Sequence, residues 1–445
     1  MTAGFELIVE AASALVDGTF RPAWIGVSSG VISAISGQPL EGKIIVTLRD
    51  DEVLIPGLVD SHVHINEPGR TEWEGFASAT RAAAAGGVTT LIDMPLNSIP
   101  ATTTVEALER KRQAASDKTI VDVGFWGGAV PQNLGRLREL HDAGVFGFKA
   151  FLAPSGVDEF EHLDAAQLER ALEEIAGFGG LLIVHAEDPG VLDAHANEGG
   201  TRYHRFVESR PEEAEVTAIE RVIAGVRQTG ARAHILHLSS AAALPALRAA
   251  RAEGLPITVE TCPHYLAISE EQVPDGGTQF KCCPPIRGRA NRDALWQAML
   301  DGDIDLVVTD HSPSTAALKF AHDGDFALAW GGIAGLQTGL AAVWTEASRR
   351  DIPLERVLGW MSTGPADFAG LATKGRIAVG GAADFVSFAP NATFTVHARE
   401  LLHKNPVSAY DGRELRGVVR QTWLAGHPVS VSADAAARGR LLDRP

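Results

Sequence analysis

The feature that most constrains this chain is a regular alternation of short apolar runs with helical segments across its middle, for example at 105–117 and 214–226. Such alternation is typical of βα units around a parallel sheet. No G-x-G-x-x-G motif follows a strand, which disfavours a doubly wound open sheet, and eight units over roughly 300 residues match the size of a (β/α)8 barrel. We therefore expect an α/β fold, a (β/α)8 barrel, whose strands are 53–64, 89–94, 120–127, 147–152, 181–186, 233–238, 257–261 and 304–310.

The two ends of the chain differ from the middle. Near both of them, short runs with the composition of strands alternate with Gly-rich turns, as in 5–12 and 417–426. Neither end alone is long enough to bury a sheet face well. We predict one small β-sandwich module that is built from both ends, 1–54 and 376–445, with the barrel inserted between them as 55–375.

Composition narrows the classes of function. The chain has 39 Lys and Arg against 56 Asp and Glu, a formal charge of −17, so an anionic nucleic acid or membrane surface would repel it. Residues 1–20 lack the basic start and continuous apolar core of a signal peptide, and no apolar run approaches the roughly 20 residues of a membrane span. Three cysteines (Cys262, Cys282, Cys283) are too few for a disulfide scaffold. We therefore expect a cytoplasmic protein that binds neither nucleic acid nor membrane.

Polar side chains interrupt the apolar runs at the ends of five predicted strands. Taken singly, each has an ordinary explanation, because a histidine near a strand end is usually structural and an aspartate there often caps the next helix. A buried lysine costs several kcal/mol unless it is paired or neutralised. The carboxyl ends of barrel strands meet at one face, where the active sites of this fold form. We therefore predict one site that gathers His62, His64, Lys149, His185, His237 and Asp310.

These residue types indicate a metal centre. Imidazole and carboxylate ligands with few sulfurs suit Zn²⁺, and also Mn²⁺, Co²⁺ or Fe²⁺. Four histidines and one aspartate serve two ions only if an anionic group bridges them, and a charged lysine has no acceptor atom for that role. A carbamate formed from Lys149 and carbon dioxide would supply two oxygens and a negative charge. We expect two divalent ions, with zinc as the first choice, bridged by carboxylated Lys149.

The surrounding motifs resemble those of the cyclic amidohydrolases, the group that contains dihydroorotases, dihydropyrimidinases (hydantoinases) and allantoinases. Over nearly the whole chain they are G-L-V-D-S-H-V-H, G-F-K-A-F-L, V-H-A-E, H-L-S-S, E-T-C-P-H-Y-L, K-C-C-P-P-I-R and V-T-D-H-S-P. By this correspondence His234, three residues before the H-L-S-S histidine, is not a ligand. The resemblance implies two metal sites that share carboxylated Lys149, with His62, His64 and Asp310 at the more buried one and His185 and His237 at the other.

The expected chemistry is hydrolysis of a cyclic amide. Two metal ions about 3.5–4 Å apart lower the pKa of a bridging water and polarise the carbonyl, so that the bridging hydroxide attacks the ring amide carbon. Asp310 is the expected catalytic residue, because a carboxylate at the edge of the metal centre can accept the proton of that water and deliver it to the departing ring nitrogen.

Two positions discriminate between the members of the group. Dihydroorotases place an arginine two residues after the second histidine, where this chain has Asn66, and we expect the nearby Arg70 to lie in the following loop. Dihydropyrimidinases place a tyrosine five residues after the bridging lysine, where this chain has Pro154. The runs H-V-H-I-N-E-P-G-R-T-E-W-E-G-F and D-M-P-L-N-S-I-P are similar to those of the allantoinase family. That resemblance implies a small neutral substrate, allantoin, opened to allantoate in purine degradation.

A neutral ring with many N–H and C=O groups calls for paired backbone and side-chain contacts without a charged clamp. We expect these contacts from Cys283, Gly332, Ser155, Ser312 and Asn97. His264 and Trp73 are interpreted as structural. Residues 313–329 form a long loop over the barrel mouth, the usual place of a lid.

Two other functions stay open at this point. One is a hydantoinase-type cyclic amidase of broader specificity. The other is a non-enzymatic barrel reused as a scaffold, although such proteins usually lose metal ligands and this chain has all six positions. Relatives of this group are often homotetramers, so a homo-oligomer is expected from the resemblance.

Overall fold

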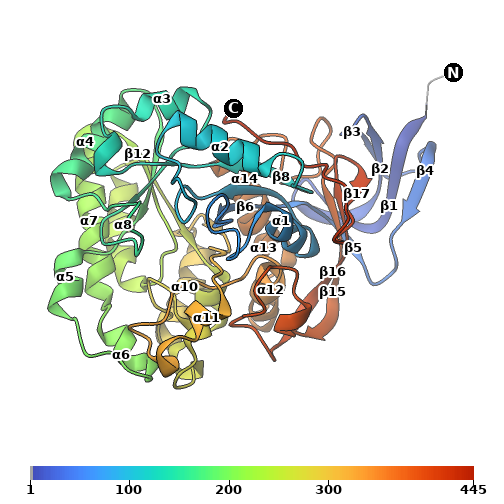
Figure 1. Ribbon diagram of the computed structural model, residues 1–445. Coiled ribbons are helices and arrows are strands. Elements are labelled where there is room, and N and C mark those ends of the chain that lie inside the picture. The colour runs from blue at the N-terminus through green and yellow to red at the C-terminus, as the bar shows by residue number, and fades with distance from the viewer. Residues whose placement is uncertain (1–3) are drawn as a thin grey trace.

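The structure is a computed structural model that describes residues 4–445 (Figure 1). A barrel of parallel strands surrounded by helices occupies one side of the molecule, and a sheet built from both ends of the chain occupies the other. The predicted fold class, a (β/α)8 barrel with a β module from both termini, is confirmed.

The barrel strands pair in parallel within two arcs, β6-β7-β8 and β9 to β14. Only Trp126 separates β8 from β9, and the His64 N–H donates to the His311 carbonyl at 2.7 Å, so the last strand meets the first and the ring closes. The strands are β6 (Leu58–Val63), β7 (Val88–Asp93), β8 (Asp122–Phe125), β9 (Gly127–Gly128), β10 (Phe148–Phe151), β11 (Leu181–His185), β12 (Arg232–Ile235), β13 (Ile257–Thr261) and β14 (Leu306–Val307).

Helices cover the outside of the barrel (Figure 1). Their ends follow local signals: Asp164 and Gln167 form a capping box at the start of α4, and Gly230 ends α7 in the left-handed conformation. The helices are α1 (Phe76–Ala85), α2 (Val105–Ala115), α3 (Leu137–Asp142), α4 (Ala165–Ala176), α5 (Pro189–Ala194), α6 (Tyr203–Glu208), α7 (Glu212–Thr229), α8 (Leu244–Ala252), α9 (Pro263–Ala267), α10 (Arg289–Asp301), α11 (Ala316–Lys319), α12 (Gly339–Arg349), α13 (Leu354–Leu358) and α14 (Gly364–Phe368). Within residues 4–445, none of these helices is long and apolar enough to cross a membrane.

The terminal sheet has the order β17-β16-β15-β5-β1-β2-β3, and β4 pairs with β1. Asp17 and Gly18 both have positive φ, 52° and 77°, the backbone of the tight hairpin that joins β1 to β2. Its strands are β1 (Phe5–Val16), β2 (Thr19–Ser28), β3 (Val31–Ser36), β4 (Gly42–Thr47), β5 (Val53–Pro56), β15 (Phe385–Thr395), β16 (Glu414–Leu424) and β17 (His427–Pro428). A core cluster with members from both ends, such as Ile25 and Phe385, lies within this module.

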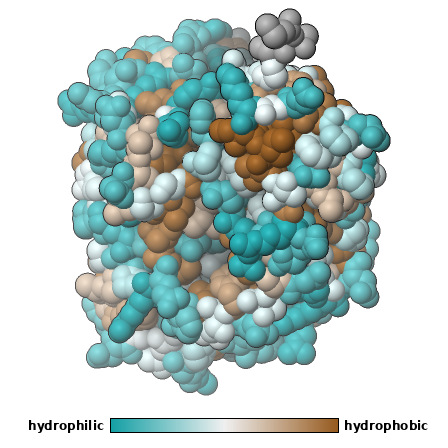
Figure 2. Space-filling model, turned by 90° about the vertical axis from the view of Figure 1, so that its right-hand side faces the viewer, coloured by the Kyte–Doolittle hydropathy of each residue, from teal (hydrophilic) through white to brown (hydrophobic). Residues whose placement is uncertain are grey.

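Figure 2 looks onto the side of the molecule that carries the terminal sheet and shows an apolar area near the N-terminal end. Strand β4 contributes exposed apolar side chains, with Ile44 and Ile45 at 59% and 52% exposure. The outer edge of the sheet is therefore not uniformly polar.

The run 53–64, expected as one barrel strand, divides into two strands in different sheets. Val53–Pro56 forms β5 and pairs with β15, whereas the barrel begins at Leu58. Gly57 stands between them, and a Cβ there would lie 2.3 Å from Thr89 Oγ1. Only glycine lets the chain pass this close to β7, so the backbone changes sheets here.

The last residues leave the terminal sheet and lie along β8 of the barrel. Val123 N–H donates to the Arg440 carbonyl at 2.9 Å, and Leu442 N–H donates to the Val123 carbonyl at 2.8 Å. The buried Asp122 carboxylate accepts from the Arg440 N–H at 2.8 Å and pairs with Lys374 at 2.6 Å. We call residues 438–444 the C-terminal tail; it covers an edge of β8 near the start of that strand.

Candidate active site

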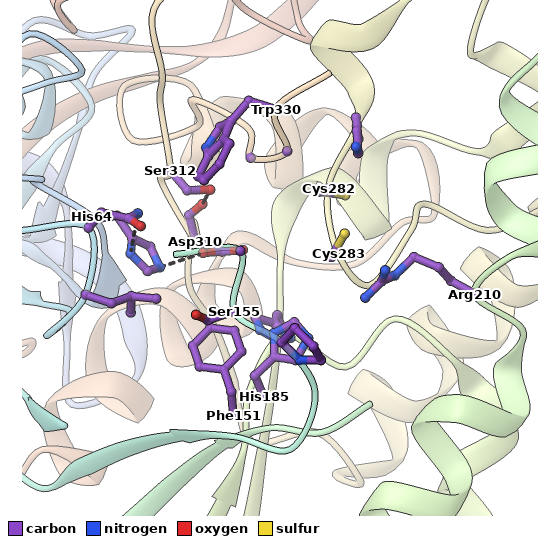
Figure 3. Close-up of a pocket in the computed structure, with 18 of the residues that line it drawn as sticks. His64, Phe151, Ser155, His185, Arg210, Cys282, Cys283, Asp310, Ser312 and Trp330 are labelled. Carbon is purple, nitrogen blue, oxygen red and sulfur yellow. Dashed lines mark hydrogen bonds and ion pairs between the residues drawn. The ribbon is translucent and has the colours of Figure 1, made fainter. Parts of the chain in front are cut away.

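The six side chains predicted as metal ligands lie at the carboxyl ends of barrel strands and are all buried, none more than 7% exposed. The rings of His62 and His64 are 5.5 Å apart, those of His62 and His237 5.4 Å, and those of His185 and His237 4.7 Å. The structure thus brings the four imidazoles together beside Asp310. Figure 3 shows two of them, His64 and His185, near Asp310. The six side chains stand on or just after five strands: His62 and His64 at β6, Lys149 on β10, His185 on β11, His237 after β12 and Asp310 after β14.

Three of these groups point at one another without satisfying each other. His62 Nε2 lies 3.1 Å and His64 Nε2 3.5 Å from the same Asp310 oxygen. Among residues 4–445, His62 Nε2 nevertheless has no hydrogen-bond partner. One atom from each of these residues falls within a 4.8 Å group that fits a cation. A buried, unpaired imidazole nitrogen aimed at a carboxylate is the arrangement that a divalent metal ion completes.

Buried carboxylates fix the orientation of two of the histidines. His62 Nδ1 is 2.5 Å from Glu260 Oε1, and His185 Nε2 is 2.7 Å from Glu187 Oε2. A partner of this kind on one ring nitrogen sets the tautomer and leaves the other nitrogen free to bind metal. Arg210 pairs in turn with Glu187. Sequence reasoning missed these three charged residues as part of the site; the signal was available for Glu187 and Glu260, since both are acidic residues at the ends of apolar runs.

Backbone strain coincides with the site. His237 has φ of 36° and Asp310 has φ of 45°, and neither is glycine. Such conformations cost of order 1–3 kcal/mol each and persist where the surroundings impose them. Both residues follow the ends of short strands, so the left-handed turn directs each side chain into the barrel mouth.

Burial sets the charge state of the candidate ligands. It lowers the pKa of His64 to about 4 and that of His237 well below its usual value, so both rings are neutral at pH 7, the form that binds metal. Burial opposes ionisation of Asp310 as well, but the nearby imidazoles, His62 first, outweigh it and hold its pKa well below the usual range. Burial lowers the pKa of Lys149 to about 8. A neutral amine is therefore well populated near that pH.

A cavity of about 390 Å³ opens onto these groups. Figure 3 shows Cys283, Ser312 and Trp330 around the space in front of Asp310. The residues predicted from the sequence to contact substrate all line this cavity: Asn97, Ser155, Cys283, Ser312 and Gly332. Lining residues that sequence reasoning did not assign to the site include Leu96, Phe151, Arg210, Lys281, Leu328 and Trp330.

Several of these lining groups already have partners within the protein. The Ser155 hydroxyl donates to the Phe160 carbonyl at 2.6 Å, and the Ser312 hydroxyl donates to the Asp310 carbonyl at 2.9 Å. Asn97 Nδ2 lies 3.5 Å from His64 Nδ1. These polar groups therefore shape the wall of the cavity and retain oxygen lone pairs for a ligand.

Of the residues that the sequence placed outside the chemistry, His234 and Arg70 have partners elsewhere, whereas the His264 ring has none in the described part of the chain. His234 uses both ring nitrogens, toward Thr258 at 2.7 Å and Glu260 at 3.0 Å. Arg70 does not line the cavity. It forms a salt bridge with Glu159 and donates a hydrogen bond to the Asn97 carbonyl. Neither ring nitrogen of the buried His264 has a partner among residues 4–445.

Comparison with known proteins agrees with this site. The sequence profile of the amidohydrolase family matches residues 53–429, which span the barrel and strands β5, β15, β16 and β17 of the terminal sheet. The fold is similar to that of an L-hydantoinase (dihydropyrimidinase) from Arthrobacter aurescens, with a TM-score of 0.93 and 29% identity over 99% of this chain and 100% of that one. The chain belongs to the amidohydrolase family, whose members carry a divalent metal centre.

Within this family, several relatives that are similar to this chain over nearly its whole length are allantoinases. One from Streptomyces avermitilis is 57% identical over 442 residues, 99% of each chain, and one from Saccharomyces cerevisiae is 42% identical over 441 residues, 95% of each chain. The chain is therefore similar to allantoinases over nearly its whole length.

Proposed function

We infer that the protein hydrolyses the cyclic amide of allantoin to allantoate, a step of purine degradation. The observation that carries this assignment is the extent of its similarity to allantoinases, 57% identity over 99% of the chain, combined with a cavity that opens onto a buried cluster of four histidines and an aspartate. The alternative of a scaffold without activity is disfavoured because all six candidate ligands are present and converge.

The residues present fit a binuclear metal centre. Asp310 and the unpaired His62 Nε2 converge with His64 on one position. We propose that these three hold the first divalent ion, that Lys149 as its carbamate bridges to a second, and that His185 and His237 complete the second site. Zinc is the expected metal, with Mn²⁺, Co²⁺ or Fe²⁺ also compatible with this ligand set. Bound there, divalent ions supply Lewis-acid activation of a water molecule and of the amide carbonyl.

The properties of Lys149 support its carboxylation. Only a neutral amine reacts with carbon dioxide, and burial lowers the pKa of this one to about 8. The side chain is 1% exposed, and its amine lies 4.8 Å from the centre of the Phe151 ring, so water does not solvate it well. The carbamate carries a negative charge into a cluster of imidazoles, where it offsets the positive charge of bound metal ions.

The chain's own contribution to the reaction is proton transfer and orientation. Water adds to the ring amide carbon, the C–N bond of the ring breaks, and the water oxygen becomes a carboxylate oxygen of allantoate. The Asp310 carboxylate accepts the proton of the attacking water and delivers it to the leaving ring nitrogen. Glu260 and Glu187 hold His62 and His185 in the orientation that the metal centre requires.

We propose that the walls of the cavity recognise the ring and its ureido arm through short polar contacts. Within residues 4–445, the Cys283 N–H and carbonyl have no protein partner, so both are free for a ligand with matched groups. The hydroxyl oxygens of Ser312 and Ser155, the Asn97 amide and the Gly332 carbonyl add further candidate contacts.

Turnover of four substrates tests the assignment. The purified, metal-loaded protein is expected to open allantoin with the highest kcat/KM, hydantoin and dihydrouracil far more slowly, and dihydroorotate most slowly of all. Arg70 lies outside the cavity, and apart from Lys149 the two cations that line it are already engaged, Arg210 with Glu187 and Lys281 with two backbone carbonyls. Elemental analysis of the same sample should find two divalent ions per chain. A higher kcat/KM for dihydrouracil than for allantoin would favour the hydantoinase alternative.

We also propose a cytoplasmic homotetramer. The three cysteines are unpaired, which fits a reducing compartment, and relatives of this group are often tetramers. Light scattering of the purified protein measures the oligomeric state.

A further inference from the structure

Two lysines beside the cavity are buried without a carboxylate partner. Lys281 is 8% and Lys319 3% exposed, and among residues 4–445 neither forms a salt bridge. The buried Lys111 and Lys374, elsewhere in the molecule, both pair with aspartates. Because an uncompensated ammonium is costly to bury, some other interaction must stabilise the ammonium groups of Lys281 and Lys319.

For Lys319 that interaction is with three backbone carbonyls. Its Nζ donates to the carbonyls of Lys281 at 3.0 Å, Trp330 at 3.1 Å and Gly332. An ammonium has three N–H bonds, so Lys319 is saturated by main-chain oxygens alone. Burial lowers its pKa to about 7, and the three carbonyl dipoles favour the protonated form against that effect.

The three carbonyls belong to two segments that wall the cavity. Residues 281–283 form one, and residues 330–332 form the other. Figure 3 shows Cys282, Cys283 and Trp330 beside the space that Asp310 faces. The segments touch directly through one hydrogen bond, from Gly332 N–H to the Lys281 carbonyl at 2.9 Å. Lys319 therefore ties together two pieces of chain that are far apart in the sequence.

The 330–332 segment has little freedom to adapt. Gly332 has φ of 106°, and a Cβ there would lie 2.1 Å from the Ser312 carbonyl oxygen. It is thus fixed against the strand end that carries Asp310. The 281–283 segment is held to this part of the chain by the Gly332 N–H bond to the Lys281 carbonyl and by Lys281 Nζ, which donates to the carbonyls of Ala327 and Ala329. Lys319 is the group that bonds carbonyls of both segments at once, including that of Gly332.

We propose that Lys319 is a positioning residue, which sets the spacing between the Cys283 and Gly332 walls so that both can contact the substrate ring at once. This rests on the proposed function, because it assumes that these walls hold the cyclic amide. Lys319 itself lies behind the walls and touches no substrate. Displacement of a binding group by about 1 Å can cost on the order of 100-fold in rate or binding.

The test compares K319M with K374M and K319R in the metal-loaded enzyme. Methionine is an unbranched side chain only one atom shorter than lysine, and it has no N–H groups. K319M is expected to raise KM for allantoin by about tenfold to 100-fold with kcat changed far less, and with metal content as in the wild type. K374M removes an equally buried lysine that lies between Asp122 and Asp384 and not at the cavity, so it should lower Tm but leave KM within about twofold. K319R, which keeps N–H donors, should bind allantoin better than K319M.

Several results would overturn the proposal. They are a KM for K319M within about twofold of the wild type, equal KM values for K319M and K319R, or a fall in kcat together with metal loss at unchanged KM. If no variant at position 319 folds while K374M does, Lys319 is a stability element only and the proposal is abandoned. Failure of the wild type to open allantoin would instead refute the proposed function; the same variants would then be compared on whichever cyclic amide it hydrolyses.

Discussion

At the scale of single residues, Asp310 has two proposed roles, metal binding and proton transfer, and both depend on its position and its charge. It lies within 3.5 Å of two imidazole nitrogens, and it adopts a left-handed backbone with φ of 45° that directs its side chain into the site. The same carboxylate can hold metal and move a proton only if it stays ionised, which the surrounding histidines ensure by lowering its pKa.

Replacement of Asp310 by asparagine should preserve the fold, because the two side chains have nearly the same shape. Loss of the proton acceptor is expected to lower kcat by about 10²–10⁴-fold. Steady-state kinetics with allantoin, together with elemental analysis, measures both effects. A near-wild-type kcat with the metal retained would contradict the role given to Asp310.

A second prediction concerns Lys149. Its pKa is lowered to about 8, so protonation suppresses the reactive amine below that pH and the neutral form dominates above it. At a fixed concentration of dissolved CO₂, the rate at which metal-free enzyme regains activity with Zn²⁺ should rise about tenfold per pH unit from 6 toward 8 and then level off. K149M should regain no activity under any of these conditions. Reactivation that is independent of CO₂ would contradict a carbamate bridge.

At the scale of elements, the ends of the barrel strands explain which features of the fold and the site could be predicted from the sequence. Polar residues in or after apolar runs predicted the barrel, and they predicted that six side chains would meet at the ends of its strands, where the structure brings them together. That these six bind metal stays a prediction. The sequence alone could not predict the tie between Lys319 and the 281–283 segment, since it depends on two loops meeting in space. The division of 53–64 at Gly57 was equally hidden, because it depends on the approach of Thr89.

The C-terminal tail runs along β8 and forms an isolated parallel bridge between Leu441 and Val123, and one residue tests this contact. A Cβ on Gly439 would lie 1.9 Å from the Val121 carbonyl oxygen, so G439A should displace the tail. The expected loss is about 1–3 kcal/mol of unfolding free energy, seen as a lower Tm in calorimetry. Because the tail lies near the start of β8 and the active site at the strand ends, KM for allantoin should be unchanged. G37A, where a Cβ meets open space, is the matched control and should leave Tm unchanged.

At the scale of the whole molecule, the barrel is an insertion within a sheet. Strands β1 to β5 come from the first part of the chain and β15 to β17 from the last, yet Ile55 pairs with Val386 and Pro56 with Phe385. The barrel and the sheet share further buried contacts: Lys374 pairs with Asp122 of the barrel and Asp384 beside β15. Strand β5 continues through Gly57 directly into β6, which carries His62, so the first barrel strand begins at the terminal sheet.

This arrangement has a consequence for biosynthesis. Strand β5 emerges from the ribosome more than 300 residues before β15, its partner, and at about 5–20 residues per second the wait is on the order of tens of seconds. Throughout that interval one edge of β5 is open, and Ile44 and Ile45 of β4 are exposed nearby even in the finished fold. A nascent chain in this state is prone to pair with another, so the yield of active enzyme in a cell should depend on translation speed and on chaperones that shield strand edges.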